Sequence, residues 1–298
     1  MLVGICLALL LTEGVLQVVA AFTGAKPSDL PSWFGVKRRM LCLGDSNTFG
    51  LYVDASQTYP KVFETLWNAE PGNGPLEVSS LGFPGLNSSQ LARDFRRLLW
   101  AFRPDTVTVM IGANDPWTIP QPVPVVGYVN RLAMMLWERS WLYRLAYLTR
   151  HAFDTQRLEV IMTTSGGAEP TSGTARYGAY EFELGSTALP EGRVPTWRPA
   201  AELRRNLTTM AMHAKQFGAN LILITYPADD GLYQFANRVL QEAAKTNDTR
   251  LIELTSTLKR SCPEENCSDL FVNHHPNVAG HRRMAEILLQ EMKRQRSR

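Results

Sequence analysis

The chain has 298 residues, of which 45% are hydrophobic and 20% charged, a composition typical of a globular protein and not of a disordered or fibrous one. Its formal net charge is only +3, and its basic residues form no stripe interleaved with aromatic residues, so we set nucleic-acid binding aside. The length suits one large α/β domain or two small ones.

The first predicted element is an apolar helix over residues 1–22, which is long enough to cross a bilayer. It holds twelve Leu, Ile, Val or Phe residues and one interior acid, Glu13. At about −0.3 to −0.6 kcal/mol each, the twelve outweigh the roughly +3 kcal/mol cost of a central acid. We therefore expect a transmembrane anchor, with the domain that follows in the periplasm or at the cell surface. A cleaved signal peptide, and hence a secreted protein, is the alternative, because small residues such as Ala20 and Ala21 fit a cleavage site.

After a linker over residues 23–38, short apolar runs alternate with segments of helical periodicity. Strands are predicted at residues 39–43, 76–81, 106–111, 220–225 and 251–254, and helices at 59–68, 88–102, 200–217, 234–245 and 277–294. Buried strands that alternate with helices indicate a parallel sheet covered on both faces. We therefore predict one α/β domain over residues 39–298.

Residues 116–199 interrupt this alternation and are predicted to form an inserted segment, because they are far longer than one crossover connection needs. They include an amphipathic segment over 132–148, a Gly/Ser/Thr-rich patch over 163–174 and a possible strand over 180–184. The amphipathic segment carries tryptophans and arginines. It fits either a helix packed on the sheet or a basic helix that lies on a membrane surface.

Two of the four cysteines, Cys262 and Cys267, bracket a short polar loop. A small loop closed by a disulfide fits an oxidising compartment outside the cytoplasm, whereas a zinc site would need further ligands that this loop does not supply. A metal site built from His274, His275 and His281 is disfavoured as well, because no carboxylate lies near them in the sequence. We expect a disulfide here, and neither a metal nor a cofactor.

Four short motifs follow predicted strands or precede the last helix, and they hold the polar residues expected to carry chemistry. In chain order they are Gly44-Asp45-Ser46-Asn47, Gly82-Phe83-Pro84-Gly85, Gly112-Ala113-Asn114-Asp115 and Asn273-His274-His275-Pro276. Ligand sites of open α/β sheets lie at the carboxyl ends of the strands. Each motif alone is a weak signal, since Ser46 could simply cap a helix and Asn114 could occupy a turn. Their order and placement indicate a single site.

These motifs resemble the four sequence blocks of the SGNH, or GDSL-type, esterase family, over about residues 39–294 apart from the inserted segment. The family is named after a serine, a glycine, an asparagine and a histidine, which Ser46, Gly85, Asn114 and His275 match. The resemblance implies a three-layer α/β/α, flavodoxin-like fold with a central parallel sheet, and the hydrolysis of esters. It also implies that Ser46 is the nucleophile and His275 its base. The main-chain N–H groups of Ser46 and Gly85 and the side-chain amide of Asn114 would then form the oxyanion hole.

One position departs from the family's pattern. The family usually has an aspartate three residues before the histidine, where this chain has Val272, while Asn273 lies two residues before it. Asn273 is therefore the candidate third member of a triad, with a main-chain carbonyl or Asp269 as alternatives. An amide orients an imidazole without offsetting its positive charge, and the Asp→Asn change in a serine-protease triad lowers kcat by about 10⁴. The site therefore works as a supported dyad, borrows Asp269, or is slow.

The leading hypothesis is a membrane-anchored esterase or lipase-like hydrolase that acts on an acylated small molecule, lipid or carbohydrate. An O-acyltransferase that modifies cell-surface polysaccharide would use the same serine. A non-catalytic glycan-binding descendant is the third hypothesis, because of the missing acid. The membrane is the expected partner of the N-terminal helix, and no nucleic acid is expected.

Overall fold

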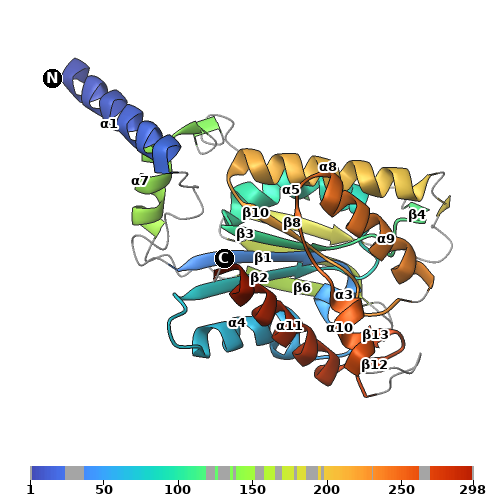
Figure 1. Cartoon of the computed structure of the whole chain (residues 1–298). Helices are drawn as coiled ribbons and strands as arrows, with labels where there is room; N and C mark the ends of the chain where they lie inside the picture. The colour runs from blue at the N-terminus through green and yellow to red at the C-terminus, as the bar shows by residue number, and fades with distance from the viewer. Residues whose placement is uncertain are drawn as a thin grey trace.

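The centre of the protein is a five-stranded sheet with the strand order β11-β10-β3-β1-β2, in which every neighbouring pair is parallel (Figure 1). The strands are β1 (Arg38–Gly44), β2 (Leu76–Gly82), β3 (Thr106–Met110), β10 (Asn220–Ile224) and β11 (Arg250–Ile252). The computed structural model describes residues 2–23, 37–118, 125–126, 135–136, 139–151, 158–164, 170–177, 180–185, 194–195, 198–229, 231–261 and 269–296.

Strand β1 lies in the middle of the hydrophobic core. Its residues Met40, Leu41, Cys42 and Leu43 are each at most 2% exposed. A strand covered by helices on both faces needs a continuous apolar run and not an alternating one, which is why these residues form a central parallel strand. Cys42 is a buried free thiol, as its place in the apolar run predicts.

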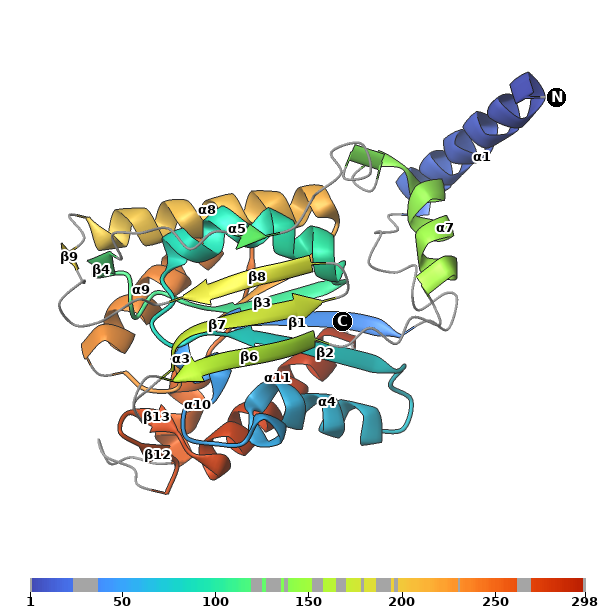
Figure 2. The same cartoon turned by 180° about the vertical axis from the view of Figure 1, so that it is seen from behind.

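Helices cover both faces of the sheet, and the strand order explains which helix lies where. From β1 the chain moves to the edge strand β2, and it then crosses back through β3, β10 and β11, so right-handed crossovers place the later helices on the opposite face from the first. One layer contains α4 (Tyr59–Ala69) and α11 (Val278–Arg296), and the other contains α5 (Ser88–Phe102), α8 (Pro199–Phe217) and α9 (Gly231–Thr246). Figures 1 and 2 show these two layers on either side of the strands. The predicted three-layer α/β/α fold is therefore confirmed.

The boundaries of the core elements follow local chemistry. Helix α5 begins at Ser88 because Asn87 accepts a hydrogen bond from the Gln90 main-chain N–H, while the Gln90 side chain accepts one from the Asn87 N–H. The core strands and helices lie within three residues of their predicted bounds. The strand predicted over 251–254 ends at Ile252, and Leu254 begins α10 (Leu254–Ser261). The Leu254 main-chain N–H is bound by the Thr225 hydroxyl, at 2.9 Å.

Within residues 116–199 the described part holds further elements that the sequence predicts only in part. A four-stranded antiparallel sheet has the order β5 (Val125–Val126), β8 (Tyr180–Gly185), β7 (Pro170–Tyr177) and β6 (Leu158–Thr164), and β4 (Trp117–Thr118) pairs with β9 (Val194–Pro195). Strand β8 is the predicted strand. The Gly/Ser/Thr-rich patch over 163–174 falls partly in β6 and β7, where its threonines suit the pleated surface.

The apolar N-terminal helix is α1 (Leu2–Thr23), which is long and apolar enough over Gly4–Thr23 to span a membrane, a property that signal sequences share. Helix α1 contacts α7 (Trp141–His151), which overlaps the predicted amphipathic segment (Figure 2). The carboxylate of Glu13 accepts hydrogen bonds from the Trp141 and Leu142 N–H groups at 2.9 and 2.8 Å. The interior acid of the apolar helix thus caps the start of α7. Cys262 and Cys267, the predicted disulfide, lie outside the described residues.

Candidate active site

Three of the four motifs meet at one edge of the sheet because of the strand register. Gly44 at the end of β1 pairs with Gly82 of β2 on one side and with Met110 of β3 on the other. The residues that follow these three positions therefore leave the sheet together. This edge is also the point between β1 and β3 where the strand order reverses, which is where ligands bind in open α/β folds.

Ser46 begins the short helix α3 (Ser46–Phe49), directly after β1. A side chain at Gly44 would place its Cβ 2.2 Å from the Thr48 hydroxyl and 2.5 Å from the Met110 carbonyl oxygen, so only glycine lets α3 fold back so closely on the sheet. Asp45 caps the helix by accepting a hydrogen bond from the Asn47 N–H at 3.1 Å. The turn that holds Ser46 is thus fixed from both sides.

His275 lies against Ser46 although 229 residues separate them in the chain. The distance from Ser46 Oγ to His275 Nε2 is 2.8 Å, and His275 Nδ1 lies 2.9 Å from the main-chain carbonyl oxygen of Asn273. A carbonyl only accepts, so Nδ1 carries the proton and Nε2 is left to accept from the serine hydroxyl. The structure therefore brings the predicted nucleophile and base together in a tautomer suited to proton transfer.

A tight hairpin sets the position of His275. The strands β12 (Phe271–Val272) and β13 (His275–Pro276) are antiparallel, with Val272 opposite His275, so Asn273 and His274 form a two-residue loop. Both loop residues have positive φ, 46° and 63°, as a type I′ turn requires. Asparagine tolerates this conformation better than most residues. Of the acceptors considered from the sequence, it is the main-chain carbonyl of Asn273 that lies on Nδ1.

Gly85 and Asn114 also lie at this edge. Gly85 has a φ of 77°, which favours glycine, in the turn after β2. The Asn114 side-chain amide donates to the carbonyl of Leu86, next to Gly85, at 3.1 Å and to Asp45 Oδ2 at 3.3 Å. One amide thus joins the second motif to the first. Because both of its hydrogens are engaged, donation to a substrate oxygen requires that one of these bonds be shared or exchanged.

The carboxylate of Asp45 is fully buried, and burial raises its pKa, against the lowering effect of hydrogen bonds from Tyr226 and Asn47. Asp115, also buried, accepts from the Ser88 N–H at 2.9 Å and from the Ser88 hydroxyl, and burial raises its pKa to about 7. Asp115 thus ties the third motif to the start of α5. The two buried acids, Asp45 and Asp115, thus support the turns that carry Ser46 and Asn114.

Three aromatic residues around the site were not singled out from the sequence. Tyr52 is 43% exposed and its ring meets the His275 ring edge-on, with 5.6 Å between centroids. Tyr226 donates to Asp45, and Tyr233 accepts from the Asn47 side-chain amide at 3.1 Å. Tyr226 follows the predicted strand over 220–225 directly. The rule that polar residues at the carboxyl ends of strands form the site could therefore have pointed to Tyr226.

His281 is buried and plays a different part from His275. Its Nδ1 accepts a hydrogen bond from the Tyr59 N–H at 3.1 Å, and burial, together with the nearby His275, lowers its pKa to about 4. No group of three or more His, Cys, Asp or Glu side chains suited to a metal ion occurs in the part of the chain that the structure describes.

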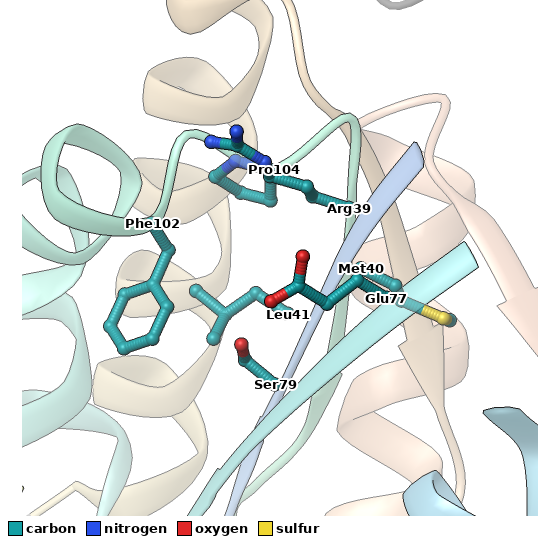
Figure 3. A pocket seen from close by; sticks show the side chains of 7 residues that line it. All are labelled: Arg39, Met40, Leu41, Glu77, Ser79, Phe102 and Pro104. Carbon is teal, nitrogen blue, oxygen red and sulfur yellow. The ribbon is translucent and has the colours of Figure 1, made fainter. Parts of the chain in front are cut away.

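A shallow hollow lies at the opposite end of the sheet, and Figure 3 shows the side chains around it, among them Arg39, Glu77 and Phe102. Arg39 and Glu77 are paired residues near the amino ends of β1 and β2, whereas Ser46 follows the carboxyl end of β1. Seven residues of extended chain correspond to roughly 23 Å. The hollow is therefore separate from the Ser46–His275 pair.

Comparison with known proteins agrees with this arrangement. The GDSL-like Lipase/Acylhydrolase family matches residues 42–283, so the chain belongs to this family of ester hydrolases. No curated protein matches the chain.

Solved structures share the fold at low sequence identity. The acetylxylan esterase Axe2 from Geobacillus stearothermophilus is 17% identical, with a TM-score of 0.52 over 87% of this chain and 95% of that one. LAE5, an alpha/beta hydrolase enzyme from the metagenome of Lake Arreo, is 15% identical, with a TM-score of 0.53 over 87% and 96%. TesA is 17% identical, with a TM-score of 0.51 over 86% and 98%.

Proposed function

We propose that the protein is a serine esterase in which Ser46 attacks the ester carbonyl, His275 is the general base, and Ser46, Gly85 and Asn114 form the oxyanion hole. The observation that carries the proposal is the 2.8 Å contact between Ser46 Oγ and His275 Nε2, with Nδ1 held by the Asn273 carbonyl. Nucleophile and base within hydrogen-bond reach, with the base oriented by a third group, are the signature of an activated serine.

The reaction follows from these contacts. As Ser46 Oγ bonds to the carbonyl carbon of the ester, its proton passes to His275 Nε2, and the carbonyl oxygen becomes an oxyanion. When the tetrahedral intermediate collapses, the bond to the alcohol breaks and the alcohol oxygen takes the proton from Nε2. Water then enters, gives a proton to Nε2 and attacks the acyl-enzyme. The second tetrahedral intermediate then collapses, which releases the carboxylic acid and returns the proton from Nε2 to Ser46 Oγ.

The oxyanion needs donors fixed before the reaction. The N–H groups of Ser46 and Gly85 and the amide of Asn114 supply them, and the loss of one such donor lowers kcat by about 10²–10³. The contact of the Asn114 amide with Asp45, at 3.3 Å, is the longer of its two bonds. We therefore propose that the oxyanion takes the place of Asp45 on that amide hydrogen.

The missing triad aspartate does not argue against activity. In a serine-protease triad, an asparagine in place of the aspartate is harmful because it holds the imidazole in the wrong tautomer. A main-chain carbonyl has no hydrogen to donate and so holds the productive tautomer. What the carbonyl lacks is the full negative charge that stabilises the imidazolium. This supports a working dyad over a non-catalytic descendant.

We propose a short-chain ester of a carbohydrate as the substrate. The exposed ring of Tyr52 beside His275 offers a platform for a sugar ring next to the reacting atoms. Axe2, which shares the fold, is an acetylxylan esterase. Transfer of the acyl group to a sugar hydroxyl would use the same acyl-enzyme, and the products of a reaction with added sugar acceptor distinguish transfer from hydrolysis.

We further propose that the domain acts outside the cytoplasm, anchored by α1, with Cys262 and Cys267 bridged. The exposed apolar surface of α1 supports an anchor, since Leu10 and Leu11 are 70% and 69% exposed. Protease digestion of intact spheroplasts tests the location. Degradation of the domain without lysis is expected, and its protection until lysis would contradict the proposal.

The esterase proposal is tested with the full-length protein in detergent and p-nitrophenyl esters of increasing chain length, together with acetylated xylo-oligosaccharides. Turnover is expected, fastest with acetyl groups, and Ser46→Ala should abolish it. Ser79→Ala, at a β2 serine away from the site, is the matched control and should keep it. Turnover that survives in Ser46→Ala with unchanged circular dichroism would refute the assignment of the nucleophile.

A further inference from the structure

Tyr226 is a fully buried tyrosine whose position is fixed on all sides. It follows β10, and its main-chain N–H donates to the Asn237 side-chain oxygen at 2.6 Å. Its main-chain carbonyl accepts from the Thr255 hydroxyl at 2.7 Å. Its ring stacks on Tyr233 with 4.7 Å between centroids and 17° between planes. The hydroxyl of Tyr226 therefore has little freedom to move.

That hydroxyl reaches two different turns of the site. It donates to Asp45 Oδ2, in the turn that carries Ser46. It accepts from the main-chain N–H of Ala113 at 3.1 Å, in the turn that carries Asn114. Asp45 Oδ2 also receives the Asn114 amide, at 3.3 Å. Residues that follow three strands, β1, β3 and β10, thus meet at the Asp45 carboxylate.

From this geometry we infer that Tyr226 is a positioning residue of the oxyanion hole, which fixes the Asn114 amide relative to Ser46. The inference rests on the esterase function proposed above. Tyr226 itself acts through Asp45 and Ala113 and is not placed on the substrate. Its hydroxyl keeps the Asp45 carboxylate in one orientation, and it holds the Gly112–Ala113 peptide group, one residue before Asn114, by the Ala113 N–H.

Removal of the hydroxyl has a defined consequence. In Tyr226→Phe, the buried Ala113 N–H loses its acceptor and Asp45 loses its donor from β10, so the Asn114 turn can shift against the Ser46 turn. Because full loss of an oxyanion donor lowers kcat by about 10²–10³, a misplaced donor should lower kcat by about 10- to 100-fold. KM should change less than about twofold, because the oxyanion forms only after the substrate has bound.

The pH profile gives a readout that a merely structural role would not move. The hydrogen bond from Tyr226 opposes the effect of burial on Asp45, so the pKa of Asp45 rises further when that bond is lost. The other titratable groups that face Asp45 are His275, Tyr59 and Asp115. These groups are unchanged in the variant. Because the Asp45 carboxylate accepts from the Asn114 amide, we expect its protonation to loosen that amide and lower kcat, so the acidic limb should extend to higher pH in Tyr226→Phe.

The test compares Tyr226→Phe with Tyr59→Phe, its matched control. Tyr59 is also a buried tyrosine, but its hydroxyl is hydrogen-bonded to the Thr48 hydroxyl, at 3.3 Å, and its interaction with Asp45 is only a coulombic one. We expect the 10- to 100-fold loss of kcat and the shifted acidic limb only in Tyr226→Phe. Equal kcat in the two variants, at equal melting temperature, would overturn the inference.

A double-mutant cycle with Asn114→Ala tests whether the effect passes through the oxyanion hole. If Tyr226 acts by placing Asn114, the double variant should be no slower than Asn114→Ala alone. Losses of kcat that multiply in the double variant would overturn the inference.

If Tyr226→Phe fails to fold, 3-fluorotyrosine at position 226 is the substitute, because it keeps the hydroxyl and donates a stronger hydrogen bond. The acidic limb of the kcat profile should then move to lower pH. An unmoved limb would count against the inference. If the wild-type protein shows no ester turnover, the esterase proposal is refuted as well. If the wild type is active and the two losses of kcat multiply, only the role of Tyr226 is refuted.

Discussion

Asp115 should make the stability of the folded protein fall as the pH rises. Burial raises the pKa of this carboxyl from 3.8 to about 7. The unfolded chain therefore releases the proton near pH 4, whereas the folded protein retains it up to about pH 7. Between these values the folded state binds more protons than the unfolded state. The free energy of unfolding consequently falls as the pH rises through this window and is level above it.

The size of the effect follows from the shift of about three pKa units. At 1.36 kcal/mol per unit, ionisation of Asp115 removes about 4 kcal/mol between pH 4 and pH 7. That is a large part of the 5–15 kcal/mol by which domains are typically stable. Asp115→Asn removes the titration while its side-chain oxygen can still accept from the Ser88 N–H. The variant should therefore gain on the wild type as the pH rises.

The assay is urea denaturation of both proteins at several pH values from about 4 to 8. Comparison of the two isolates Asp115, because the other titrating groups contribute equally to both. Glu242→Gln, in an exposed ion pair with Arg204, is the control and should differ little from wild type at any pH. A difference between Asp115→Asn and wild type that stays constant with pH would refute the reasoning, and a wild type that gains on the variant as the pH rises would mean that the carboxylate is stabilised in the fold.

Three further predictions concern α11, which holds His281, and the hairpin of β12 and β13, which holds Asn273 and His274. His281→Gln should remove a stability gain of about 3 kcal/mol between pH 4 and 6.5, because a buried histidine with a pKa of about 4 binds fewer protons than the unfolded chain; equal pH slopes in denaturation would contradict this. His274→Gly should leave kcat within twofold, since glycine suits the φ of 63° and keeps the Asn273 carbonyl on His275; a larger loss of kcat would count against the type I′ turn. Asn273→Asp should change kcat less than about threefold near neutral pH, because the main-chain carbonyl already holds Nδ1; a tenfold gain would place the side chain on the imidazole instead.

The sequence was sufficient for the parts of the fold that depend on local patterns. The apolar run of β1 and the apolar spacing of α5 are such patterns, and both elements lie where they were predicted. The motif positions could also be found, because polar residues at successive strand ends meet at one edge of a parallel sheet. Each of these inferences needs only the residues of one segment, or the rule that parallel strands end together.

Contacts that depend on strand order could not be found in this way. Tyr226 reaches Asp45 across 181 residues only because β10 lies next to β3 in the sheet. Glu13 shows the same limit, since an interior acid counts as a cost to an apolar helix when that helix is considered alone. Its partners, the first N–H groups of α7, lie 128 and 129 residues away. Neither partner is close enough in the chain for periodicity or spacing to reveal it.

At the third position of the candidate triad, a main-chain carbonyl and not a side chain lies on the imidazole. A search by residue type looks for a carboxylate near His275 and finds Val272 and Asn273 instead. The hairpin explains both residues. Val272 pairs with His275 across the two strands, and Asn273 suits a turn position with positive φ. The turn directs the carbonyl of residue 273 at Nδ1, and any residue that adopts this turn supplies the same acceptor. Residue 273 therefore serves the imidazole through its backbone conformation, and the productive tautomer does not require the acid that the family usually has at the position of Val272.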